Sequence, residues 1–215
     1  MTHFHIITLF PDSIRPYLDS SILGKAQAAK KIKVSYYDPK DFTRDRYGRV
    51  DRRPYGGGPG MVLEPDAILR AVQKAVGKKK AEILFFATDG AQFDEPMAAK
   101  LAKKKDIVLI CGHYEGIDAR VQKILKAKKV TVGPYVLTGG ELPAATIIDC
   151  VARFVPRVLG KAESLEASRV SSPEVYTRPE VLKWKGKNYK VPPVLLSGNH
   201  AKMDEWKRKK RGLDK

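Results

Sequence analysis

The chain has 215 residues, a length that suits one large domain or two small ones. It is 43% hydrophobic and 30% charged, which excludes a chain that is disordered by composition. Its 41 Lys and Arg residues against 24 Asp and Glu give a net charge of +17, which favours a polyanionic partner such as nucleic acid, although a lysine-rich solubilising surface has the same composition.

Apolar spacing predicts strands that alternate with helices along most of the chain. We expect strands at 4–10, 31–38, 82–88, 106–112 and 128–133. We expect helices within 14–31 and at 66–76, 95–105, 115–125, 142–155 and 199–212. In the helix at 66–76, one apolar face carries Ile68, Leu69, Val72 and Val76. The stretch 39–65 is long, polar and aperiodic, and loops of that length are usually functional or disordered.

This alternation predicts an α/β fold with a mostly parallel sheet that is covered on both faces. We expect one α/β domain at 1–159 and a polar linker at 160–175. Residues 176–215 would form a small, basic, helical C-terminal domain.

The cysteines and the first residues bear on location. Cys111 and Cys150 offer neither zinc spacing nor a disulfide framework, which fits a reducing cytosol. The N-terminal sequence has no basic leader, and no apolar stretch approaches the length of a membrane span. We therefore expect a cytoplasmic protein with no membrane partner.

Three glycine-bearing loops stand out at 55–61, 111–118 and 132–143. The last two follow predicted strands, at the edge where open α/β sheets bind ligands. Glycines let the backbone approach a ligand closely, although single loops of this kind are often ordinary turns. The chain has neither a G-x-G-x-x-G fingerprint nor a P-loop, so a dinucleotide enzyme or a nucleotide hydrolase is disfavoured.

The helix after the third loop carries two charged residues. Pro143 fits its first turn. Asp149 and Arg153 are four residues apart and share a face. They would form a modest intrahelical ion pair, or Asp149 would position Arg153 to meet negative charge that develops in a site.

Six motifs together resemble one family. "YGGGPGM", "ICGHYEGIDARV", "VGPYVLTGGELPA", "IIDCVARFVPRVLG", "YTRPE" and "VLLSGNHAKMDEW" are similar, in this order, to the bacterial tRNA (guanine-N1)-methyltransferases of the SPOUT superfamily. The resemblance covers nearly the whole chain. It implies methyl transfer to N1 of the guanosine at position 37, just 3′ of the anticodon.

The resemblance also implies a deep trefoil knot in the C-terminal part of the α/β domain, and a homodimer with its active site at the subunit interface. It implies that S-adenosylmethionine lies bent among the knot loops. The implied cofactor-binding residues are Phe85, Phe86, Ala87, Gly112, Tyr114, Glu115, Gly116, Thr131, Val132, Gly133, Tyr135, Leu137, Gly139, Gly140 and Pro143.

The resemblance gives Arg153 the role of donor to guanine O6. The family's general base is a linker Asp, but this linker is short, has no Asp and places Ser168 at the ungapped position. We assign the base to Glu166, reaching across the dimer interface; the alternative is that Glu166 and Glu163 are solvated linker charges. His113 and Pro134 also depart from the family pattern, where Arg and often Asp stand, which puts some substrate contacts in doubt.

The basic tail and the loop at 43–53 would bind phosphates of the anticodon stem, and Tyr and Arg residues of the Tyr47–Tyr55 loop would stack on bases. The "YTRP" stretch at 176–179 would dock the tail domain on the partner subunit. Two alternatives remain open: a related SPOUT RNA methyltransferase with another target, and a catalytically impaired protein that binds S-adenosylmethionine and RNA. The sequence leaves open a Mg²⁺ requirement, the tRNA preference and the order of the linker without RNA.

Overall fold

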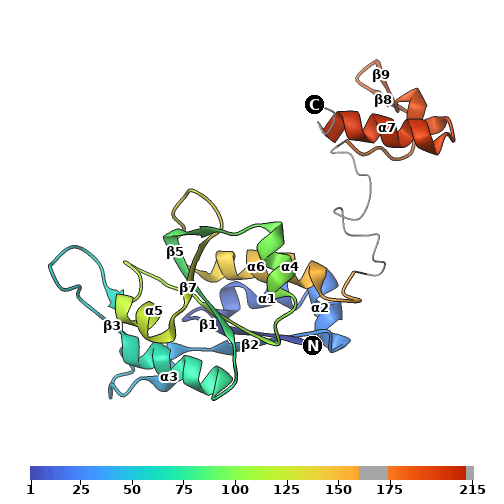
Figure 1. Ribbon diagram of the computed structural model, residues 1–215. Helices are drawn as coiled ribbons and strands as arrows, with labels where there is room; N and C mark the ends of the chain where they lie inside the picture. The colour runs from blue at the N-terminus through green and yellow to red at the C-terminus, as the bar shows by residue number, and fades with distance from the viewer. Residues whose placement is uncertain (160–173, 212–215) are drawn as a thin grey trace. The chain divides into compact units, whose positions relative to one another are not determined.

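The computed structural model describes residues 1–159 and 174–211 (Figure 1). The chain divides into two compact units, Met1–Leu159 and Gly160–Lys215. The expected linker at 160–175 therefore lies almost wholly outside the described residues. No helix within the described ranges is long and apolar enough to cross a membrane.

A five-stranded sheet in the order β2-β1-β6-β5-β7 forms the centre of the first unit, and all of its neighbouring strands are parallel. Its strands are β1 Thr2–Ile7, β2 Ile32–Tyr37, β5 Glu82–Gln92, β6 Asp106–Ile110 and β7 Lys128–Thr131. The predicted α/β class with a mostly parallel sheet is confirmed.

Helices cover both faces of this sheet (Figure 1). The helices of the first unit are α1 Arg15–Leu18, α2 Ser21–Ala28, α3 Pro65–Val76, α4 Glu95–Leu101, α5 Ala119–Leu125 and α6 Glu141–Phe154. One apolar core joins α1, α2, α4 and α6 to the sheet, around Phe4, Ile6 and Leu109. A second joins α3 and α5 to the opposite face, around Val108 and Ile110.

The predicted apolar face of α3 is confirmed. Ile68, Val72 and Val76 are buried, and Leu69 is half-buried against the same core. The starts of the two short helices are capped by carboxylates: Asp94 accepts a hydrogen bond from Met97 N at α4, and Asp118 accepts one from Arg120 N at α5.

Several predicted elements were wrong in extent. The stretch 39–65 contains the 3-10 helix η2 (Pro39–Phe42) and a two-stranded antiparallel sheet of β3 (Asp51–Arg52) and β4 (Val62–Leu63). The helix expected within 14–31 is two helices, with the short η1 (Pro11–Ser13) before them. Strand β5 runs on to Gln92 through an irregularity between Phe86 and Ala91, and α4 and α5 are shorter than expected.

The second unit contains a β-hairpin as well as helices, which corrects the prediction of a helical C-terminal domain. Strands β8 (Val181–Trp184) and β9 (Lys187–Lys190) form an antiparallel hairpin, followed by η5 (Pro193–Leu196) and α7 (His200–Arg211). Lys185 and Gly186 in the turn have φ of 49° and 74°, the left-handed backbone that two-residue hairpins favour. The hairpin is rich in Lys and lacks an apolar alternation, so periodicity did not predict it.

Candidate active site

The ends of β5, β6 and β7 and the loops that follow them surround a cavity of about 350 Å³. Because the three strands are parallel, their carboxyl ends meet at one edge of the sheet, where ligands of open α/β folds bind. All of the predicted cofactor residues line this cavity except Gly133. The two glycine loops at 111–118 and 132–143 are thus brought together.

Other lining residues were not predicted: Thr88, Asp89, His113, Ile117, Val130, Val136 and Thr138. Most of them are sequence neighbours of predicted residues. Their place beside those residues is the sequence signal that could have identified them as lining the cavity. Gly133 lies beside the cavity, where its carbonyl accepts a hydrogen bond from Thr131 Oγ1 at 2.8 Å.

Backbone hydrogen bonds hold the two loops together. Gly140 N donates to the carbonyl of Gly112 at 2.9 Å, and His113 and Gly139 form an isolated antiparallel bridge. A Cβ on Gly140 would lie 2.5 Å from Cys111 Cα, so the approach requires glycine at this position. The wall of the cavity therefore depends on backbone contacts between segments that are distant in the sequence.

The third glycine loop, at 55–61, does not line the cavity but braces one of the loops that do. Glu115 N donates to Met61 O at 3.0 Å, and Leu63 N donates to Gly116 O at 2.9 Å. Gly60, at φ 77°, lies so close to Glu115 that a Cβ would meet its carboxylate at 2.6 Å. Its role in the structure is support of the second loop.

A buried carboxylate ties β1 to the start of α6. Glu141, 7% exposed, accepts a 2.6 Å hydrogen bond from Thr8 Oγ1 and lies in the first turn of α6, where the helix dipole favours negative charge. Burial and the charge of Glu141 raise the pKa of the Cys111 thiol well above its ordinary value. Cys111 is therefore a protonated packing residue rather than a nucleophile.

One polar atom of the cavity wall is unsatisfied. Nδ1 of His113 is buried and makes no hydrogen bond within the described part of the chain. The ring packs against Phe10 and Tyr114, with centroids 4.7 and 4.9 Å away. This nitrogen lies against the backbone of Gly139, where an added Cβ would be 2.8 Å from it, so it is closed off from the open cavity.

Arg153 does not line this cavity. It lies towards the other end of α6, where it borders two further hollows with Tyr17 and Asp149. Tyr17 OH donates to Asp149 Oδ2, and this hydrogen bond raises the pKa of Tyr17. Ten residues of α6 separate Pro143 from Arg153, about 15 Å along the axis. Glu166, Ser168 and Glu163 lie outside the described residues.

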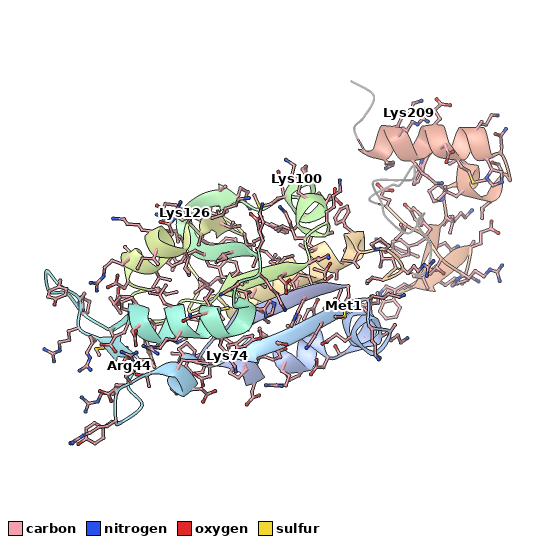
Figure 2. All side chains as sticks on the ribbon, turned by 60° about the horizontal axis from the view of Figure 1, so that its bottom comes forward. Met1, Arg44, Lys74, Lys100, Lys126 and Lys209 are labelled. Atoms are coloured by element: carbon pink, nitrogen blue, oxygen red, sulfur yellow. The ribbon has the colours of Figure 1, made fainter. Side chains whose placement is uncertain are left out.

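Basic and aromatic side chains crowd the 43–55 loop. The guanidinium carbons of Arg46 and Arg49 lie 4.4 and 5.5 Å from the centre of the Tyr47 ring. Tyr47 and Tyr55 are both exposed. Figure 2 shows Arg44 and Lys74 close together on this unit, where they line one shallow hollow with Arg70. Such a surface suits phosphates and unstacked bases.

Comparisons with known proteins all match this chain to one family, over nearly its whole length. The model of the family "tRNA (Guanine-1)-methyltransferase TrmD" matches residues 2–214. The tRNA (guanine-N(1)-)-methyltransferase of Carboxydothermus hydrogenoformans is 42% identical over 213 residues, which are 97% of this chain and 82% of the relative. That of Dictyoglomus turgidum is 41% identical over 214 residues (97% and 84%), and that of Clostridioides difficile is 39% identical over 212 residues (95% and 90%).

Proposed function

The chain belongs to the tRNA (guanine-1)-methyltransferase family, and on that premise we propose that it transfers a methyl group from S-adenosylmethionine to N1 of the guanosine at position 37 of tRNA. Methylation of tRNA guanine N1 is the reaction for which its relatives are named. The observation that carries the proposal is the gathering of the expected cofactor residues around one cavity at the carboxyl edge of the sheet.

The residues present fit S-adenosylmethionine. The cavity volume of about 350 Å³ is within the usual range for small-ligand sites. The hydrogen bond between Gly140 N and Gly112 O holds the two glycine loops together, and the loops and strand ends around the cavity offer both apolar side chains and backbone to a flat heterocycle. We assign adenosine binding to the 85–87, 112–116 and 131–143 segments. When bound, the cofactor supplies an electrophilic methyl group.

The chain's own residues must prepare the guanine. Neutral guanine N1 is a poor nucleophile, so a base must take its proton, a step typically worth about 10²- to 10⁴-fold. We assign this step to Glu166 in place of the family's Asp. Negative charge then grows on O6, and a guanidinium placed there is worth about 10²- to 10³-fold. We assign that donor role to Arg153.

A second copy of the chain completes the site in this proposal. Within one subunit, Arg153 lies about 15 Å along α6 from the cavity-lining Pro143, too far to act on a base that receives the cofactor's methyl group. A homodimer in which Arg153 of one copy faces the cavity of the other removes this difficulty. The trefoil knot expected of the family would hold the two glycine loops in fixed register.

The RNA is assigned to the basic surfaces. The net charge of +17 and the Arg–Tyr cluster of the 43–55 loop supply phosphate contacts and stacking rings for the anticodon stem-loop. We propose that residues 176–215 form a tRNA-binding domain joined by a linker at 160–175. Both cysteines are free thiols, which suits the cytoplasm.

Methyl transfer from S-adenosylmethionine to a tRNA transcript with G at position 37 tests the proposal, with an A37 transcript as control. Glu166→Gln and the matched linker variant Glu163→Gln are assayed beside the parent. We expect transfer to the G37 transcript alone, lost in Glu166→Gln and kept in Glu163→Gln. Equal transfer to A37 tRNA would point to another target, and tRNA binding without transfer would identify an impaired binding protein.

A further inference from the structure

A polar cluster lies at the sheet edge opposite the cofactor cavity. It joins His3 and His5 of β1 to Asp106, the first residue of β6. His3 is paired with Asp106 in the register of the two strands, and His5, two residues on, points to the same face. One potential ligand atom from each lies within 4.8 Å of the other two. Six residues of strand and loop, about 20 Å, separate Asp106 from Gly112 at the cavity.

We propose that His3, His5 and Asp106 bind one zinc ion, a site independent of methyl transfer. Zinc is bound by imidazole nitrogen and carboxylate oxygen at about 2.0–2.1 Å, so two tetrahedral ligand atoms lie about 3.3 Å apart. In this structure His5 Nε2 lies 2.9 Å and His3 Nδ1 3.8 Å from the same oxygen, Asp106 Oδ1. The two distances bracket the required separation, and all three ligand atoms lie within 4.8 Å of one another, so small movements of the side chains would admit the ion.

The outward nitrogens of both rings already have partners. His3 Nε2 lies 2.8 Å from Ser35 Oγ, and His5 Nδ1 lies 3.2 Å from Tyr37 OH, both on β2. Zinc-bound histidines nearly always hydrogen-bond through the nitrogen that does not face the metal, which fixes the tautomer and the ring plane. Here each ring presents one nitrogen to Asp106 and anchors the other, the arrangement that a zinc site needs.

The ligand set also selects the metal. Two imidazoles favour zinc over Mg²⁺, which prefers oxygen ligands and keeps several waters. His3 and Asp106 are about 15% exposed, so a water can reach the fourth position. The charges of Lys33 and Lys79 act on both imidazoles and oppose any cation, so they weaken the site.

The same contacts would also serve a metal-free hydrogen-bonded cluster, in which His5 shares a proton with Asp106. Metal stoichiometry separates the two. The full chain is stripped with a chelator and dialysed against micromolar ZnCl₂, and bound zinc is counted by atomic absorption. Co²⁺ is substituted to record the ligand-field spectrum of the site. The variants are His3→Ala, Tyr37→Phe, Lys79→Gln and, as a matched control on α7, His200→Ala.

We expect one zinc per parent chain and a tetrahedral Co²⁺ spectrum. His3→Ala should lose the metal, and His200→Ala should keep it. Tyr37→Phe should weaken binding by about tenfold or more, because it removes an anchoring hydrogen bond, and Lys79→Gln should tighten it. His3 is partly exposed, so His3→Ala should fold, which its thermal unfolding verifies. A parent that binds no zinc, or His3→Ala binding zinc as the parent does, would overturn the proposal.

Discussion

Replacing Gly140 with alanine tests how the cofactor cavity is built. The added Cβ would lie 2.5 Å from Cys111 Cα and 3.0 Å from Gly112 N, which are backbone atoms of a buried strand end. Gly140 has φ −83°, which alanine adopts freely, so restriction of the unfolded chain alone would stabilise the variant by about 0.4–1 kcal/mol. Overpacking costs about 1–3 kcal/mol, and the hydrogen bond to Gly112 O would be stretched. We expect a net loss of about 1–2 kcal/mol in the free energy of unfolding.

Gly133→Ala is the matched control. Its Cβ would also clash, at 2.2 Å, but with the ring of Tyr135, which is 55% exposed and free to swing outward. We expect the free energy of unfolding to change by less than about 1 kcal/mol there. Denaturant unfolding measures stability, and calorimetry measures S-adenosylmethionine affinity, which should fall at least about tenfold in Gly140→Ala. A Gly140→Ala variant as stable as the parent, with unchanged affinity, would refute the close-approach argument.

Three further predictions follow from single contacts. Thr8→Val leaves the buried carboxylate of Glu141 without its hydroxyl partner, so thermal unfolding should show a loss of about 1–3 kcal/mol. Asp118→Ala removes the cap of α5 and should cost about 1 kcal/mol in denaturant unfolding, whereas Asp118→Asn should keep most of it. Arg49→Ala removes one cation beside Tyr47, so the slope of log K for tRNA against log salt should shrink by about 0.7–0.9 in a filter-binding titration; an unchanged slope would place the RNA elsewhere.

The parallel sheet and its helices could be predicted because burial imposes a pattern. Residues 107–110 of β6 are a continuous apolar run, and α3 repeats apolar residues at helical spacing. Elements held mainly by local hydrogen bonds escaped prediction. Strands β3 and β4 have two residues each, too few to show an alternation of apolar and polar residues. All four residues of β9 are exposed, so the hairpin shows no such alternation either.

The candidate site was predictable in part. Glycine loops after strands marked the cavity, since parallel strands bring their carboxyl ends together. What could not be predicted depends on three-dimensional neighbours. The Thr8–Glu141 hydrogen bond joins segments more than 100 residues apart. The unpaired nitrogen of His113 is a consequence of burial, which the sequence does not show. The position of the glycine loop at 55–61, which packs against Glu115, did not follow from the sequence.

The distance between the cavity and Arg153 makes the composite site testable by mixing subunits. Leu137→Arg would fill the cavity of its own chain, and Arg153→Ala would remove the donor. If each site takes its cofactor from one copy and its arginine from the other, a mixed dimer holds one intact site and one doubly damaged site. Equal mixing should then restore about a quarter of the parent rate, because about half of the dimers are mixed and one of their two sites works. If each chain carries a complete site, the mixture should stay as inactive as its components in the tRNA methylation assay.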